Sequence, residues 1–167
     1  MSEPEMIRET HGGIYLTPEG FAALQHELEH LTQNKRPEIA ERIRESQQHG
    51  EFSEDNSELD EVKFEQAVVE NRIAELKSMF GNAHVLEPDM IPTEFVGLGS
   101  YAEVEDTEYL DRFEVRVVAS IEADPARELI SNESPMGMAI LGHRVGEEVV
   151  FDTPDGRKRY KLISIRK

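Results

Sequence analysis

An acidic segment, HGEFSEDNSELDE at residues 49–61, is the part of the chain whose residue types could do chemistry. It holds six carboxylates between positions 51 and 61 and no lysine or arginine. Carboxylates this close repel one another, so such a run is either a solvated face or a place that meets a cation. Mg²⁺ takes one or two protein carboxylates together with water and phosphate oxygens. Since nothing in the segment encloses a substrate, it would supply a ligand to a metal ion held by another molecule.

Helical patterns on both sides must position this segment. The first begins at Thr17-Pro18-Glu19, where Thr17 suits the N-cap and Pro18 the first helical position. Its apolar stripe is Phe21, Leu24, Leu28 and Leu31, extended less regularly by Ile39 and Ile43. Pro37 lies inside this run and would cost about 3 kcal/mol in an unbroken helix. We therefore expect a kink or a local break there.

The second pattern is a heptad seam with one polar member, Gln66. The seam consists of Leu59, Val62, Gln66, Val69, Ile73, Leu76 and Phe80, and Gly81-Asn82 follows as a stop. Two such helices joined by about ten residues fold back most economically as an antiparallel coiled-coil hairpin. Residues 49–58 then lie at its far tip.

The pentapeptide HELEH at residues 26–30 matches a zinc-peptidase pattern, with His26 and His30 on one helix face. The apolar stripe of the same helix must face its partner helix, which turns both histidines to solvent. No third ligand or cleft is at hand, so we interpret them as exposed surface residues.

The second half of the chain has a different pattern. Short alternating segments at residues 100–106, 112–120, 146–152 and 159–167 predict strands, and Pro154-Asp155-Gly156 predicts a hairpin turn. Residues 134–142 predict a short helix ended by Gly142. The fold class is thus α+β. The predicted organisation is a disordered N-terminus at 1–13, a hairpin with an acidic tip at 14–86, a linker at 87–94 and a small antiparallel-sheet domain at 95–167.

Composition narrows the function. Lys and Arg number 18 against 35 Asp and Glu among 167 residues, a net charge of −17. Free nucleic acid is a poor sole partner for such a chain, because its binding rests on Lys and Arg. There is no cysteine, which fits a reducing cytoplasm. No apolar run is long enough to suggest a membrane partner or a signal peptide.

Several motifs in order resemble the Gre family of bacterial transcript cleavage factors, and its GreA branch in particular. KRPEIAERIRESQQHGEFSEDNSELDEVKFEQAVVENRI at residues 35–73 is similar to the family's coiled-coil segment. IEADPARELISNESPMGMAILGHRVGEEVVFDTPDG at residues 121–156 and YLTPEGFAALQHELEHL at residues 15–31 also fit. The resemblance covers residues 14–166.

The resemblance implies an FKBP-like C-terminal domain that binds bacterial RNA polymerase and a coiled coil that enters its secondary channel. The tip would share a Mg²⁺ ion with the polymerase site, which cleaves backtracked RNA by two-metal hydrolysis. The factor would be an accessory and not itself an enzyme. We expect a cytoplasmic monomer that meets the nascent RNA 3′ end and DNA only inside the elongation complex.

The resemblance also implies roles for individual residues. Glu51 and Glu54 match the family's tip acids, and with Asp55 they are the candidate metal-site residues. Three others, Asp124, Ser134 and Pro135, match motifs expected at the polymerase-binding edge, although Ser-Pro is also a common helix start. Four basic residues, Lys35, Arg36, Arg42 and Arg44, correspond to a patch near the RNA. They are interleaved with glutamates, however, and basic residues in that arrangement are more often ordinary surface ion pairs.

Departures from the family pattern leave alternatives open. Glu51 stands where the family has Asp, the tip has one extra residue, most simply Asp55, and Leu59 stands where the family usually has Tyr. An altered tip would suit an inhibitor that occupies the same channel. A peptidyl-prolyl isomerase or chaperone is a third hypothesis, weakened by the lack of an obvious aromatic pocket for proline.

Overall fold

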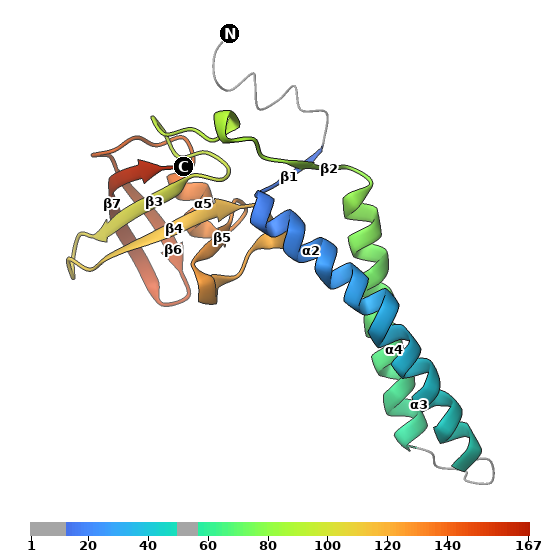
Figure 1. The fold of residues 1–167 in the computed structure, drawn as a ribbon. Helices are drawn as coiled ribbons and strands as arrows, with labels where there is room; N and C mark the ends of the chain where they lie inside the picture. Colours follow the sequence, from blue (N-terminus) through green and yellow to red (C-terminus); the bar gives the residue numbers. More distant parts are fainter. Residues whose placement is uncertain (1–12, 50–56) are drawn as a thin grey trace. The chain divides into compact units, whose positions relative to one another are not determined.

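The computed structural model describes residues 13–49 and 57–167, and the predicted metal-site residues Glu51, Glu54 and Asp55 lie outside these ranges. So does nearly all of the N-terminus expected to be disordered. The chain divides into two compact units, one comprising Ala22–Asn82 and the other the chain up to Phe21 together with Ala83–Lys167 (Figure 1). The domain limits expected from the sequence stay a prediction, and each unit is described by itself.

The helical unit is an antiparallel hairpin. Its first arm consists of α2 (Pro18–His30) from Ala22 onward, a π-helical turn (Leu31–Lys35) and α3 (Arg36–His49). The helix α4 (Ser57–Phe80) returns alongside α3 (Figure 1). Ion pairs between the arms establish the antiparallel direction. Glu27 pairs with Arg72, Arg36 with Glu70 and Arg42 with Glu65, so residue numbers fall along α4 as they rise along the first arm.

The seam between the arms is apolar, as the heptad pattern predicts. Ile39, Val62, Val69 and Ile73 form one buried cluster, with Leu28, Leu31 and Ile43 packed against it. Gln66 is a correction to the predicted seam: its side chain is exposed, because an amide gains more from water than from an apolar contact. At the end of α4, Met79 is buried and Phe80 is partly buried.

The break expected near Pro37 takes the form of the π-helical turn that precedes it. There the N–H of Arg36 donates to the carbonyl of Leu31, five residues earlier. A π turn accommodates one extra residue. The spacing from Leu31 to Ile39 is eight residues, which is two helical turns plus one residue. The extra residue explains why the stripe looked irregular in the sequence while Ile39 is 1% exposed.

The sheet unit holds a five-stranded sheet in the order β5-β4-β3-β7-β6. Its strands are β3 (Tyr101–Asp106), β4 (Arg112–Val118), β5 (Leu129–Ser131), β6 (Glu148–Thr153) and β7 (Gly156–Arg166). Neighbours are antiparallel except β4 and β5, which are parallel. The helix α5 (Pro135–Ile140) contributes Ile140 to the core formed with Ala102, Val104, Val117 and Leu162. This is the expected small sheet domain with a short helix.

Local turn chemistry in this unit follows the sequence. Thr153 pairs with Gly156 across the predicted Pro-Asp-Gly turn. Gly142 ends α5 with a positive φ of 81°. Such a backbone angle favours glycine because a Cβ would be strained there.

A second, two-stranded parallel sheet joins β1 (Ile14–Leu16) to β2 (Ala83–Val85). Leu16 is fully buried, and its carbonyl accepts the N–H of Leu86 at 2.7 Å. A short 3₁₀ turn at Pro88–Met90 follows. Over the described ranges, no helix is long and apolar enough to cross a membrane.

Replacing Ile73 with alanine should lower the free energy of unfolding of the hairpin by about 3 kcal/mol, because the lost side chain leaves a cavity in the seam. Ile73 is 2% exposed. The matched control is Val68→Ala on the same helix, where the side chain is 52% exposed and the change should stay within about 0.5 kcal/mol. Urea unfolding followed by helical circular dichroism measures both. Equal losses in the two variants would contradict the assignment of the seam.

Candidate functional site

The candidate metal-site residues connect α3 to α4 in the sequence, between His49 and Ser57. Since they lie outside the described residues, their role stays a prediction. Among the residues that the structure does describe, no group of three or more histidine, aspartate or glutamate side chains is placed to hold a metal ion. His26 and His30 are both exposed, as expected, and the Nδ1 atom of His30 lies 3.1 Å from the side-chain amide of Asn34.

Three of the four basic residues predicted near RNA contact α4. Arg36 donates two hydrogen bonds to the carboxylate of Glu70, both at 2.8 Å. Arg42 donates to Glu65 at 2.8 Å, and the ammonium of Lys35 lies 3.4 Å from the same carboxylate. The hydrogen bonds from these arginines lower the pKa of Glu65 and of Glu70, so both carboxyls are ionised at neutral pH.

Arg44, the fourth basic residue, pairs with Glu41 one turn away on α3. All four cations are thus engaged by carboxylates, which is the arrangement of ordinary surface pairs. The pairs are partly or largely exposed, and pairs of this kind contribute little to stability. A proximity to RNA stays a prediction, and an incoming phosphate would have to compete with these carboxylates.

A further ion pair joins α2 to α4. Arg72 donates to Glu27 through Nε at 2.7 Å and through Nη2 at 3.0 Å. This two-point contact matches the planar guanidinium to the carboxylate. The hydrogen bonds, followed by the charge of Arg72, lower the pKa of Glu27 against the opposing effect of partial burial.

Ser134 and Pro135 have a structural role in the sheet unit. Ser134 is the N-cap of α5: its hydroxyl accepts the N–H of Gly137 at 3.0 Å and donates to the carbonyl of Ser131 at 2.6 Å. Pro135 occupies the first helical position, where its missing N–H costs nothing. A Cβ on Gly137 would lie 2.0 Å from the same carbonyl of Ser131, so glycine is required there.

Asp124 lies at the start of a short 3₁₀ turn (Pro125–Arg127) on the other side of β5 in the chain. Its backbone exchanges two hydrogen bonds with Leu129, at 2.8 and 3.1 Å. Its carboxylate makes no capping hydrogen bond, and the described residues offer it no ion pair. The backbone of Asp124 is therefore fixed while its charge remains available.

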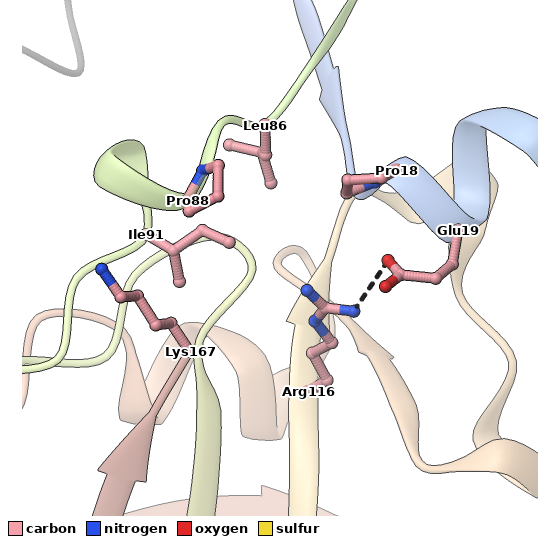
Figure 2. Close-up of a pocket in the computed structure, with 7 residues that line it drawn as sticks. All are labelled: Pro18, Glu19, Leu86, Pro88, Ile91, Arg116 and Lys167. Atoms are coloured by element: carbon pink, nitrogen blue, oxygen red, sulfur yellow. Dashed lines mark hydrogen bonds and ion pairs between the residues drawn. The ribbon is translucent and has the colours of Figure 1, made fainter.

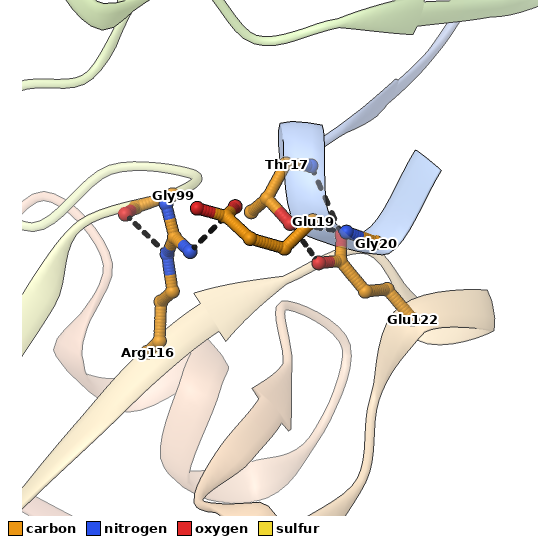
Figure 3. A network of polar contacts seen from close by, with 6 residues as sticks. All are labelled: Thr17, Glu19, Gly20, Gly99, Arg116 and Glu122. Carbon is orange, nitrogen blue, oxygen red and sulfur yellow. Dashed lines mark hydrogen bonds and ion pairs between the residues drawn. The ribbon is translucent and has the colours of Figure 1, made fainter. Parts of the chain in front are cut away.

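Sequence reasoning missed a polar clamp at the start of α2 (Figure 3). The N-cap hydroxyl of Thr17 accepts the N–H of Gly20 at 3.0 Å, as predicted, and also donates to a carboxylate oxygen of Glu122. The other oxygen of Glu122 accepts the N–H of Thr17 at 3.1 Å. A Cβ on Gly20 would lie 2.1 Å from the carboxyl carbon of Glu122. The glycine therefore makes room for this long-range contact.

Arg116 is a second missed residue, a charge inside the apolar run of β4. Its side chain is 8% exposed. Nε donates to the carbonyl of Gly99 at 3.0 Å and Nη1 donates to Glu19 at 3.3 Å (Figure 3). The guanidinium lies 4.5 Å from the ring centroid of Tyr101. The signal in the sequence was an arginine between Val115 and Val117. A charge inside an apolar strand is expected to be buried, and a buried cation needs fixed partners.

Comparisons with known proteins agree over nearly the whole chain. A family model described as "Transcription elongation factor, N-terminal" matches residues 14–85, and one described as "Transcription elongation factor, GreA/GreB, C-term" matches residues 91–167. The chain is 44% identical to the transcription elongation factor GreA of Acetivibrio thermocellus over 158 residues, 95% of this chain and 99% of that protein.

Two further relatives cover similar lengths. The GreA of Thermoanaerobacter pseudethanolicus is 44% identical over 154 residues, 92% of this chain and 98% of that protein. The crystal structure of GreA factor homolog 1 (Gfh1) of Thermus thermophilus is 34% identical and covers 93% of this chain and 99% of that one, with a TM-score of 0.43.

Replacing Ser134 with alanine should lower the free energy of unfolding of the sheet unit by about 1 kcal/mol, because α5 loses its cap. Ser134→Thr keeps both the donor and the acceptor and should lose less than half as much. Chemical unfolding of both variants measures the difference. If the alanine variant is as stable as the threonine variant, the hydroxyl is not serving as the cap.

Glu27→Gln should lower stability at pH 7 by less than about 1 kcal/mol, the range of partly exposed pairs. Because folding lowers the pKa of Glu27, the stabilisation is present above the unfolded pKa and is lost as pH falls through the folded pKa. The difference from the native chain should therefore shrink below about pH 4. Urea unfolding between pH 7 and pH 3 measures it. Glu29→Gln, on the exposed side of the same helix, is the matched control, because it removes a carboxylate that has no ion pair among the described residues.

Proposed function

Because the chain belongs to the GreA/GreB family of transcription elongation factors, we propose that it binds RNA polymerase and stimulates cleavage of backtracked nascent RNA. The observation that carries the proposal is the match of both family models, in order, over residues 14–85 and 91–167. The relatives are matched over almost their whole length, 99% for the Acetivibrio protein. The proposed role is therefore that of an accessory factor which restarts an arrested polymerase.

The helical hairpin is suited to deliver the acidic segment. The 24 residues of α4 correspond to a length of about 36 Å. Antiparallel packing against α3 over a buried seam makes this arm stiff, because protein interiors are close-packed. We propose that the hairpin enters the secondary channel of the polymerase and that the segment between α3 and α4 acts at its catalytic centre.

Glu51, Glu54 and Asp55 would hold a Mg²⁺ ion shared with the polymerase. Three carboxylates on one short segment supply the oxygen donors that this ion prefers. When bound, the ion would stabilise charge on the phosphate and help to generate the attacking hydroxide. The contribution of this chain is to present the carboxylates and to orient a water molecule by hydrogen bonding.

The sheet unit would dock on the polymerase through the edge that carries Asp124 and the Ser134-Pro135 helix start. Support comes from the free carboxylate of Asp124, and from Pro135 and Met138, which are both exposed. Met138 is 61% exposed, so its side chain is accessible to a partner. An apolar contact beside a negative charge fits a partner surface that is apolar with a basic rim. Lys35, Arg36, Arg42 and Arg44 would then lie near the RNA.

The test is the fate of RNA in a halted elongation complex. The native chain should shorten the RNA from its 3′ end. Glu51→Ala with Glu54→Ala should slow this cleavage by about two orders of magnitude without loss of polymerase binding. Asp55→Ala and Glu51→Asp, made singly, show whether the extra residue or the longer arm supplies the working ligand. The matched control removes two other carboxylates, Glu58 and Asp60, from the exposed first turn of α4.

Binding without RNA shortening by the native chain would reject the cleavage role. If nucleotide addition also slowed on complexes that have not backtracked, the chain would be a channel-occupying inhibitor. RNA shortening by the chain without polymerase would overturn the accessory role.

A further inference from the structure

A pocket in the sheet unit combines apolar walls with two cations (Figure 2). It has a volume of about 280 Å³ and is lined by Pro18, Leu86, Pro88 and Ile91, together with Glu19, Arg116 and Lys167. None of these residues has a place in the proposed cleavage mechanism. The inference drawn from them does not depend on the proposed function.

Arg116 is fixed, and one of its nitrogens remains open to the pocket. Nε is held by the carbonyl of Gly99, and Nη1 contacts Glu19. Nη2 has no hydrogen-bond partner among the residues that the structure describes, and Figure 2 shows this end of the guanidinium directed between Leu86 and Ile91. No buried side-chain nitrogen of the described residues lacks a partner, so Nη2 is open to solvent in the pocket, where a charged donor can bind an incoming anion.

Lys167 adds a second positive charge from another strand end. It follows β7, while Arg116 lies within β4. Within the described part of the chain, the ammonium of Lys167 has no ion-pair partner. Figure 2 shows this ammonium directed away from Arg116, so Lys167 adds positive charge to the pocket only at longer range.

Without a ligand, the carboxylate of Glu19 contacts the guanidinium of Arg116. Its contact with Nη1 is long, 3.3 Å, and its side chain is 74% exposed, so it can swing into water at little cost. A backbone hydrogen bond, followed by the charge of Arg116, lowers the pKa of Glu19. Glu19 is therefore an anion at neutral pH and competes with any other anion for Arg116.

We propose that this pocket binds a carboxylate carried on a short aliphatic body. The carboxylate would contact the guanidinium of Arg116, in place of Glu19, and the aliphatic part would contact Leu86, Pro88 and Ile91. The volume is at the small end of ligand pockets, which suits a branched chain of a few carbons. Such a group could be a free short-chain acid or the carboxyl end of a polypeptide with an aliphatic last residue.

The experiment is a titration of the isotope-labelled full chain followed by amide NMR shifts of Leu86, Ile91 and Gly99. The probes are 4-methylpentanoate, a tripeptide ending in leucine, the same tripeptide amide, and inorganic phosphate. We expect saturable binding of the first with a dissociation constant on the order of 1 mM, and none of the amide. Tighter binding of the free-acid peptide would identify a polypeptide end as the source; tighter binding of 4-methylpentanoate would identify a free acid.

Two variants change affinity in opposite directions. Glu19→Gln removes the competitor and should tighten binding about threefold, whereas Lys167→Gln should weaken it about threefold. Glu108→Gln, at an exposed residue of the β3–β4 turn, removes one negative charge as Glu19→Gln does and should leave affinity unaltered. Thermal unfolding of each variant checks that the fold is retained.

Three results would overturn the proposal. One is the absence of saturable shifts at these amides up to about 20 mM of either carboxylate, far above the expected constant. Another is equal binding of phosphate, which would mean that the apolar walls contribute nothing. The last is an affinity of Glu19→Gln no higher than that of Glu108→Gln, because Glu19 would then not compete for the guanidinium.

Discussion

The burial of a short apolar seam between two antiparallel helices is the constraint on which the helical unit depends. Ile39, Val62, Val69 and Ile73 are between 1 and 7% exposed, and each such side chain contributes about 1.5–3 kcal/mol when removed from water. The ion pairs that cross the same interface are partly exposed, and pairs of that kind contribute at most about 1 kcal/mol each. Apolar packing therefore sets the stability of the hairpin, while the ion pairs select the antiparallel register by matching Arg36 with Glu70.

Charge is distributed unevenly over this frame. The basic residues of α3 are all engaged by carboxylates, so the sides of the hairpin are close to neutral wherever those pairs form. The acidic excess is left unbalanced by any lysine or arginine between residues 50 and 62. A long-range field from the hairpin thus arises mainly near the turn, where it attracts cations and repels anions. This distribution fits a factor whose chemistry is concentrated in one short segment.

Local features could be predicted because they depend on a few neighbouring residues. The Thr17 cap, the turn at residues 154–156, the stop at Gly142 and most of the apolar seam all follow from such short patterns. Contacts between distant residues could not: Glu122 is 105 residues from Thr17, and no periodicity reports that pairing. The parallel pairing of β4 with β5 was hidden in the same way. In the candidate site, the choice among the tip carboxylates came from resemblance, whereas the pairing of Lys35, Arg36, Arg42 and Arg44 required coordinates.

The π-helical turn at Leu31–Lys35 has a consequence for how such a hairpin can vary. One added residue rotates everything beyond it by about 100° around the helix axis. In a regular helix Ile39 would lie about 80° away from Leu31, and the π turn brings it back in line with the seam. Pro37 then lies in the first turn of α3, where a proline is tolerated. Inserting or deleting one residue in this turn would rotate α3 around the helix axis by the angle of one residue. The number of residues in this turn therefore sets the rotation of α3, whatever side chains α3 carries.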